Sequence, residues 1–338
     1  MRSRVLLTLA ALVASGLAVA PVEASGARTN GGADAATVST AAKDLRKSRG
    51  LFVDPKMPGA KHGAVYKKAF GSKAQALWII PEAYGTPSVR KAVRAYTSRA
   101  LKAKKTPTLS IYGIPGRDCG GHSSAGALQN AEQYRAWIRQ VGKGLDDQKA
   151  LVILEPDALP FFGSNVPCDR PEGWLAMLRF ASKTLSKSGA WVYIDAGHSD
   201  WRPYEQRPAQ LKQAGIEFAR GFSTNVSNFR STADEKAYAQ TMVTELRKLG
   251  VTGVHYVIDT SRNGAANPVN GQVINPPWAR VGKPPKLVFD GAFDGTLWVK
   301  HPGESDGYEN GGNSSGKWCA MLADRLIDGT SDQTSCPE

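Results

Sequence analysis

Short apolar runs alternate with longer amphipathic stretches along this chain. We predict strands at the apolar runs, because each run is short and rich in β-branched and aromatic residues. They cover residues 76–81, 108–114, 151–154, 191–197, 221–226, 255–261 and 295–300. Helices are predicted between them, where apolar residues recur with helical spacing, at residues 87–104, 131–144, 171–187, 207–214, 232–249 and 315–328. This alternation is typical of an α/β protein.

The run Leu151-Val152-Ile153-Leu154 has no polar alternation. Such a strand suits a parallel sheet that is covered on both faces. No Gly-x-Gly-x-x-Gly turn follows any predicted strand, which argues against a dinucleotide-binding fold. We therefore predict a β/α barrel of about seven parallel strands, with a cleft built by the loops at the strands' C-terminal ends.

The N-terminal segment carries two arginines, then a short apolar stretch, then small residues. This order predicts a secretory signal peptide over residues 1–24, with a retained anchor as the alternative. Residues 25–49 are rich in Ala, Gly, Ser, Thr and Asn and predict a poorly ordered leader. Residues 50–338 are then one large domain of a secreted, extracellular protein that has no membrane contact after signal removal.

Export to an oxidising compartment predicts that the four cysteines are paired. The sequence permits three pairings. We favour Cys119 with Cys168, since each lies in a loop after a predicted strand, and Cys319 with Cys336, which would pin the C-terminal tail. The cysteines are scattered without metal-ligand spacing, so neither a metal site nor a cofactor is predicted.

The formal net charge is +13 at pH 7. The lysines and arginines are dispersed along predicted helices rather than gathered in a block with aromatic residues, which favours a solvated surface over a nucleic-acid site. Weak attraction to an anionic surface remains as a side effect.

Three predicted strands finish on or beside an aspartate: Asp157, Asp195 and Asp259. A single aspartate at such a place is more often a helix cap or a turn former. Because the C-terminal ends of parallel strands meet at one edge of a sheet, three of them predict a shared acidic cleft.

Several long motifs occur in a fixed order along the chain: YGIPGRDCGGHSSAG at 112–126, LEPDAL at 154–159, YIDAGHSDW at 193–201, STNVSNF at 223–229, DTSRNG at 259–264 and LWVKHPGESDG at 297–307. In this order and spacing they closely resemble glycoside hydrolase family 6, secreted cellulases that cut β-1,4-glucan with inversion. The resemblance covers roughly residues 50–330. It implies a distorted TIM-like barrel with an open substrate cleft, acting on a β-glucan polysaccharide. We expect a monomer.

Asp157 is the candidate general acid. It follows a hydrophobic run and Pro156, where partial desolvation would keep its carboxyl protonated near neutral pH. The resemblance assigns a supporting role to Asp118, whose negative charge raises the pKa of a neighbouring acid. It also assigns to Tyr112 the crowding of the sugar at the scissile bond.

Asp306 is the candidate catalytic base by the same resemblance. An inverting enzyme needs its two carboxyl groups about 6.5 to 9.5 Å apart, with a water between base and substrate. A relay through loop waters near Ser123 and Ser124 toward Asp118 is the competing account.

Glucan binding needs flat apolar platforms and groups that bind hydroxyls. The resemblance implies stacking by Trp78, Trp201 and Trp278, and hydroxyl contacts by His198, Asn225, Lys300 and Glu304. The alternatives are that Trp78 is a core residue and that Lys300 pairs with Glu304 at the surface. Asp195 binds substrate or orients its neighbours. We interpret Asp259 as mainly structural, holding Arg262 or loop amides.

Many family members carry a cysteine directly after the tryptophan matched by Trp278 and another after the Asp-Gly of the base motif, and the two form a disulfide that clamps the base loop. This chain has Ala279 and Tyr308 at those positions. The resemblance therefore predicts a more mobile Asp306 loop.

The short loops around the predicted cleft favour an endo-acting β-1,4-glucanase. Two alternatives stay open. One is an exo-acting cellobiohydrolase, and the other is a catalytically weakened protein that binds carbohydrate or cell wall.

Overall fold

The computed structural model describes residues 36–37 and 50–338, except 125, 147, 164–166, 169 and 266–270. The predicted signal peptide and most of the predicted leader lie outside the described residues. Within the leader, strand β1 (Ala36–Thr37) pairs in parallel with β7 (Val251–Thr252). Among the described helices, none combines the length and the apolar composition that a membrane span requires.

The central sheet has eight strands in the order β2-β3-β4-β5-β6-β8-β10-β9. Seven are parallel, which confirms the predicted α/β fold: β2 (Leu77–Ile79), β3 (Thr108–Ile111), β4 (Ala150–Leu154), β5 (Ala190–Asp195), β6 (Gly221–Thr224), β8 (His255–Asp259) and β10 (Phe293–Leu297). The eighth strand, β9 (Lys286–Asp290), is antiparallel to β10 at the sheet edge. It was not predicted, because its outward positions are exposed and it begins and ends on charged residues.

The sheet curls so that its first strand meets the chain just after β10. The Ala76 amide donates to the Trp298 carbonyl at 3.0 Å. The Trp78 indole N–H donates to the Val299 carbonyl at 2.8 Å. These bonds join the two sides of a distorted barrel without a ladder between β2 and β10.

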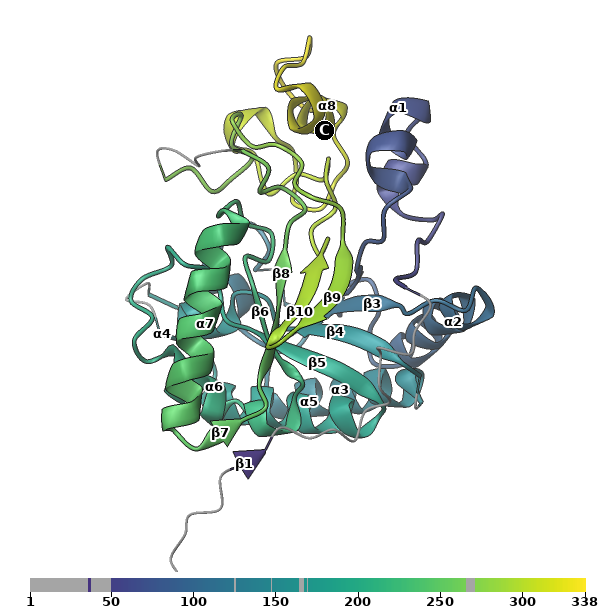
Figure 1. Ribbon diagram of the computed structural model, residues 1–338. Helices are drawn as coiled ribbons and strands as arrows, with labels where there is room; N and C mark the ends of the chain where they lie inside the picture. The colour runs from purple at the N-terminus through teal and green to yellow at the C-terminus, as the bar shows by residue number, and fades with distance from the viewer. Residues whose placement is uncertain are drawn as a thin grey trace, which may run out of the picture. The chain divides into compact units, whose positions relative to one another are not determined.

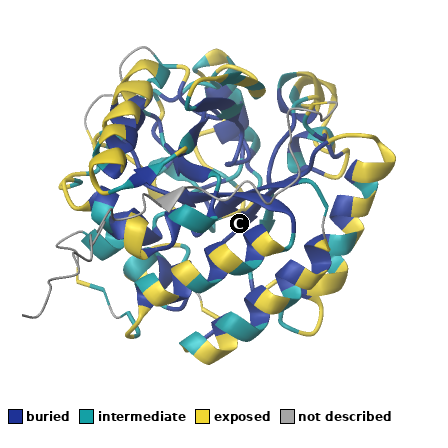
Figure 2. Cartoon of the chain, turned by 60° about the horizontal axis from the view of Figure 1, so that its bottom comes forward, coloured by how far each residue is buried: buried dark blue, intermediate teal, exposed yellow. Residues whose placement is uncertain are grey.

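The outer face of the sheet is covered by α2 (Val89–Lys102), α3 (Ala131–Leu145), α5 (Trp174–Lys187) and α7 (Thr232–Lys248), as Figure 1 shows. Each of these helices is buried on one side and exposed on the other (Figure 2). Asn130 and Ser231 cap α3 and α7 with side-chain oxygens that accept from the amides of Gln133 and Asp234. Such caps satisfy amides that the first helical turn leaves free.

The remaining helical segments are short: η2 (Pro58–Ala60), α1 (Ala64–Tyr66), η3 (Lys67–Gly71), η4 (Arg117–Gly120), α4 (Ala158–Gly163), α6 (Arg207–Gln213), η5 (Ile216–Phe218), η6 (Glu309–Gly311) and α8 (Ala320–Asp328). α8 starts later than predicted because Trp318 is still extended and bridges to Glu304. α5 also starts late, after Gly173, whose φ of +80° does not fit a helix.

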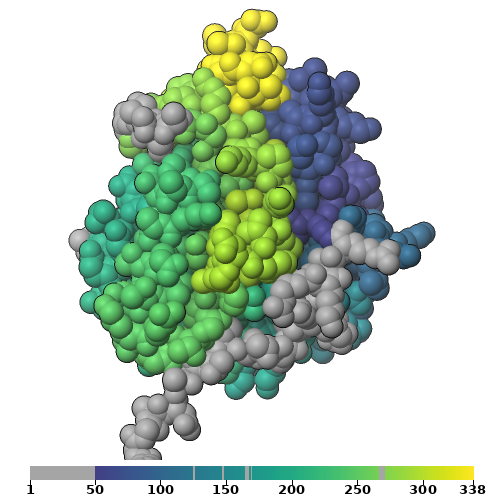
Figure 3. All heavy atoms as spheres, viewed as in Figure 1, coloured from purple at the N-terminus to yellow at the C-terminus, as the bar shows by residue number. Residues whose placement is uncertain are grey.

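The first part of the domain packs against its C-terminal part (Figure 3). The Tyr66 hydroxyl donates to Asp324 at 2.8 Å, and the rings of His62 and Trp318 stack at 4.4 Å. These contacts between residues far apart in sequence hold the C-terminal part of the chain against the start of the domain.

Disulfides join Cys119 to Cys168 and Cys319 to Cys336, which confirms the favoured pairing. The first closes a sequence separation of 49 residues and the second one of 17. The chain-entropy model gives about 4 and about 3 kcal/mol for loops of these lengths.

We predict that the double variant Cys119→Ala/Cys168→Ala loses both stability and turnover, because Cys119 follows Asp118 directly. The matched variant Cys319→Ala/Cys336→Ala should lose somewhat less stability and keep most of its turnover. Urea unfolding and initial rates on a soluble cello-oligosaccharide measure both. Equal losses of turnover in the two variants would contradict this assignment.

Candidate active site

Asp157 lies just beyond the C-terminal end of β4, where the backbone bends sharply. Glu155 and Asp157 both have positive φ, at 49° and 67°. Non-glycine residues in this conformation are uncommon and are often found at functional sites. The Asp157 amide donates to the Asp195 carboxylate at 2.9 Å, which fixes the bend against the end of β5.

The pKa of Asp157 lies well above its usual range. Burial is the largest cause, followed by the negative charges of Asp195, Asp118 and Asp306. Asp195 ends β5, Asp118 lies in η4 and Asp306 lies in the loop after β10, so the structure brings the predicted acid, its supporting aspartate and the candidate base into one site. A carboxyl in this setting keeps its proton near neutral pH.

Asp118 lies in η4, where Asp118 and Cys119 have positive φ of 58° and 45°. Its carboxylate accepts from the Ser123 amide at 2.6 Å. Burial raises the pKa of Asp118, although the Ser123 hydrogen bond and the nearby His122 and Arg117 oppose it. Asp118 and the relay residue Ser123 are therefore in direct contact.

Tyr112 is buried beside Trp78, with ring centroids 5.5 Å apart and edge to face. The Arg117 guanidinium lies 4.8 Å from the centre of the Tyr112 ring. The same guanidinium donates to the Ser123 carbonyl at 2.9 Å and pairs with Glu82 at 3.0 Å. Arg117 thus contacts both Tyr112 and the Asp118 loop, and Glu82 holds Arg117 in place. The sequence alone did not reveal this positioning role of Arg117 and Glu82.

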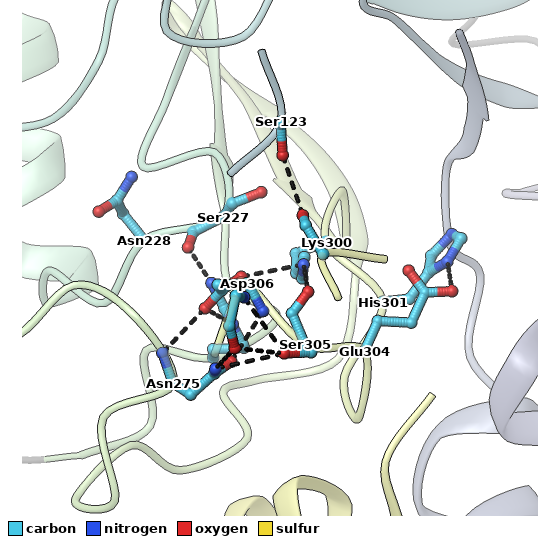
Figure 4. Close-up of polar contacts among 12 residues, drawn as sticks. Ser123, Ser227, Asn228, Asn275, Lys300, His301, Glu304, Ser305 and Asp306 are labelled. Atoms are coloured by element: carbon cyan, nitrogen blue, oxygen red, sulfur yellow. Dashed lines mark hydrogen bonds and ion pairs between the residues drawn. The ribbon is translucent and has the colours of Figure 1, made fainter. Parts of the chain in front are cut away.

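Asp306 is clamped between two cations. Its carboxylate lies 2.6 Å from Arg262 Nη1 and 2.9 Å from Lys300 Nζ, and it also accepts from the Asn275 amide at 3.2 Å (Figure 4). Burial would raise the pKa of Asp306, but Arg262 and Lys300 outweigh it and lower the pKa to about 2. Asp306 is therefore an anion across the working pH range of most enzymes.

Asp195 lies beneath the site and is 1% exposed. Besides the Asp157 amide, its carboxylate accepts from the Gly197 amide at 3.2 Å and the Ser223 hydroxyl at 3.1 Å. Burial raises the pKa of Asp195 to about 7, against these hydrogen bonds. Of its two predicted roles, this geometry favours the orientation of Asp157.

Asp259 holds loop amides, as the structural interpretation predicts. Its carboxylate accepts from the amides of Ser227, Ser261 and Lys300 at 2.9 to 3.1 Å. It does not hold Arg262, which pairs with Asp306 instead.

The predicted hydroxyl-binding residues occupy different settings. Asn225 is buried, and its amide already donates to the Asp259 carbonyl and accepts from the Arg230 amide. The alternative pairing of Lys300 with Glu304 is wrong: Lys300 contacts Asp306, and Glu304 lies 2.9 Å from His301 Nδ1.

His198 is buried, and its Nδ1 accepts from the Asp200 amide at 3.2 Å. Burial, with Arg230 and Arg207 nearby, lowers the pKa of His198 to about 3, so its ring is neutral. A neutral imidazole retains one N–H, which can donate to a hydroxyl.

The three predicted platforms are each half-buried. Trp78 packs against the barrel interior as well as Tyr112. Trp201 lies between Phe161, at 5.0 Å, and His198, at 5.5 Å between ring centroids. Trp278 packs edge to face on Phe229 at 5.5 Å.

Two buried glutamates support the site and were missed by sequence reasoning. Glu155 accepts from the amides of Gly113 and Ile114 at 2.8 and 2.9 Å and from the Tyr134 hydroxyl at 2.9 Å. Glu235 accepts from the Ser199 amide at 2.8 Å. Burial raises the pKa of each to about 7. Glu155 could have been found from the sequence, because it lies only two residues before Asp157.

The raised pKa of Glu155 predicts a pH-dependent stability. Its folded pKa lies above its unfolded value, so the folded state binds more protons and the free energy of unfolding falls as pH rises from about 4 to 7. Glu155→Gln resembles the protonated form, so its melting temperature should fall less between pH 5 and pH 8 than that of the wild type. Circular dichroism melts at the two pH values measure this; equal falls would contradict it.

Across residues 50–338, leaving out the gaps named above, no three His, Cys, Asp or Glu side chains gather as metal ligands. Two buried carboxyl groups with opposite pKa shifts converge here: the pKa of Asp157 is raised and the pKa of Asp306 is lowered. This arrangement suits acid–base chemistry on a polar bond.

Known proteins similar to this chain are glycoside hydrolases. The family described as "Glycosyl hydrolases family 6" matches residues 53–326. Endoglucanase A of Cellulomonas fimi is 40% identical over 281 residues, which are 81% of this chain and 60% of that protein. Endoglucanase 1 of Streptomyces sp. strain KSM-9 is 35% identical over 313 residues, covering 87% of this chain and 84% of that protein.

Among solved structures, the endoglucanase Cel6 from Mycobacterium tuberculosis, in complex with methyl-cellobiosyl-4-deoxy-4-thio-β-D-cellobioside, superimposes with a TM-score of 0.75 at 35% identity. The match covers 82% of this chain and 96% of that one. Because the family match spans most of the domain and includes Asp118, Asp157 and Asp306, the chain belongs to glycosyl hydrolase family 6.

Proposed function

We propose that this chain is a secreted endo-acting β-1,4-glucanase that hydrolyses cellulose or a related β-glucan with inversion. The observation that carries the proposal is the state of Asp157. Its carboxyl is buried beside Asp195, Asp118 and Asp306, and this setting raises the pKa of Asp157 well above its usual range, whereas Arg262 and Lys300 lower the pKa of Asp306 to about 2. The endoglucanase relatives support the substrate class.

In the proposed reaction, Asp157 donates its proton to the oxygen that bridges two glucose units. A water attacks the anomeric carbon from the opposite face and replaces that oxygen. Asp306 is the candidate base that takes the water's proton, so the anomeric configuration inverts. Asp195 orients Asp157, and Tyr112 crowds the sugar ring.

A relay to Asp118 is the second account of the base. The Ser123 amide contacts Asp118 directly, and the Ser123 hydroxyl lies 2.9 Å from the Ser315 hydroxyl in the Asp306 loop (Figure 4). In this account, loop waters near Ser123 and Ser124 would carry the proton from the attacking water to the Asp118 carboxylate.

We propose that Trp78, Trp201 and Trp278 stack on successive sugar rings, and that His198, Lys300 and Glu304 contact hydroxyls. Because its amide is used by the backbone, Asn225 acts in this proposal by shaping the loop after β6 rather than by direct contact.

One observation favours the exo-acting alternative. His122 pairs with Glu309 at 2.8 Å, so the Asp118 loop touches the Asp306 loop, and a bridge of this kind would roof part of an open groove. Endo action should lower the viscosity of a soluble cellulose derivative before much reducing sugar appears. A release of reducing sugar at nearly constant viscosity would favour the cellobiohydrolase.

Proton NMR of the first product from a soluble cello-oligosaccharide tests the proposed function. We expect the new reducing end to appear first as the α-anomer, which is the inverted configuration. A β-anomer would refute inversion. No hydrolysis would favour the weakened carbohydrate-binding protein instead.

A further inference from the structure

The Asp306 loop is held by side-chain amides. The family cysteine after the tryptophan is replaced by Ala279 here, and all four cysteines are used by the two disulfides described above. Something else must therefore keep the Asp306 carboxylate in register with Asp157.

Asn275 lies at the centre of these contacts and is 5% exposed. Its side-chain N–H groups donate to the carbonyls of Gly307 at 2.7 Å and Glu309 at 3.1 Å. Its side-chain oxygen accepts from the Asp306 amide at 2.8 Å. Its backbone amide donates to the Asp306 carboxylate at 3.2 Å. Figure 4 shows Asn275 bonded to both Asp306 and Ser305.

The chemistry of asparagine fits this place closely. One primary amide supplies two N–H donors and one oxygen acceptor, and here the amide of Asn275 uses donors and acceptor within residues 305–309 of the loop. The backbone φ of Asn275 is +46°, a left-handed conformation that asparagine tolerates better than most residues. The loop packs tightly around this amide, since a Cβ on Gly312 would lie 2.2 Å from Asn275 Nδ2.

We propose that Asn275 is a positioning residue that fixes the Asp306 carboxylate for catalysis and replaces the missing covalent clamp by hydrogen bonds. The inference rests on the proposed function, because it assumes that Asp306 acts in glucan hydrolysis. It also explains why loss of the cysteine need not loosen the loop.

Two variants of Asn275 test the role of its side-chain hydrogen bonds. Asn275→Gly keeps the left-handed conformation and removes all side-chain hydrogen bonds. Asn275→Asp keeps the acceptor for the Asp306 amide but loses both donors. Asn310→Gly is the matched control: Asn310 also has positive φ, at 56°, but among the described residues its side chain donates to the Ile274 carbonyl and not to Asp306.

Melting temperature, kcat and KM on a soluble cello-oligosaccharide should be measured for the wild type and all three variants. We expect kcat to fall about 10-fold to 100-fold in both Asn275 variants with KM within about twofold of the wild type, because small displacements of a reacting group are costly. Asn310→Gly should lose melting temperature but keep its kcat.

A kcat like that of Asn310→Gly in both Asn275 variants would overturn the proposal, whatever their melting temperatures. So would a rise in KM at unchanged kcat, which would indicate a role in binding only. A wild type that does not hydrolyse the substrate would instead refute the proposed function, so the two failures are distinguishable.

Discussion

Replacing Asp157 with Ala should lower the turnover of a cello-oligosaccharide by a factor of about 10² to 10⁴, the range that positioned acid catalysis contributes. The reason is that the departing sugar would leave as an unprotonated alkoxide. Binding should be nearly unchanged, because the proposed platforms and hydroxyl contacts remain. Initial rates and isothermal titration calorimetry with the same oligosaccharide measure the two effects.

Asp200→Ala is a suitable control for this variant. Asp200 lies in a loop after β5, and its side chain is 59% exposed and pairs with Arg230. We expect its turnover to stay within a few-fold of the wild type. Full turnover in Asp157→Ala would remove Asp157 from the mechanism.

Replacing Asp306 with Ala should reduce both turnover and stability. The side chains of Asp306 and its partners Arg262 and Lys300 are only 11%, 4% and 10% exposed. Removing the Asp306 carboxylate leaves the nearly buried Arg262 and Lys300 without this anionic partner. Removing one partner of a buried ion pair typically lowers the free energy of unfolding by about 3 to 5 kcal/mol. Urea unfolding measures the stability; an unfolding free energy equal to that of the wild type would show that the two cations find other partners.

The acidic limb of the pH–rate profile separates the two accounts of the base. A base must be ionised, so turnover falls as pH drops through its pKa. If Asp306 is the base, the limb lies near pH 2, because Arg262 and Lys300 lower the pKa of Asp306 to about 2. If Asp118 receives the proton, the limb lies at higher pH than this, because burial raises the pKa of Asp118 above its usual value.

The positions of the parallel strands along the chain could be predicted from the sequence. Runs such as Leu151–Leu154 are apolar throughout, which is typical of a strand covered on both faces. Strand β9 escaped prediction because it lies at the sheet edge and carries exposed residues. The late start of α8 also escaped, because a pairing with Glu304 holds Trp318 extended.

The candidate acid could be predicted because its local surroundings, an apolar strand and a proline, already disfavour an anion. The state of Asp306 could not, since it depends on Arg262, which is 44 residues away in sequence. Asn225 shows the same limit. It lies in a motif that resembles a sugar-binding motif, but its side-chain amide donates to the carbonyl of Asp259, 34 residues away.

The leaving group of the substrate gives the most direct test of Asp157 as the proton donor. Wild type and Asp157→Ala should be compared on a natural cello-oligosaccharide and on a cellotrioside with a dinitrophenyl leaving group, which departs without protonation. We predict a loss of about 10²-fold or more on the natural substrate and only a small loss on the activated one. Equal losses on both substrates would contradict proton donation by Asp157.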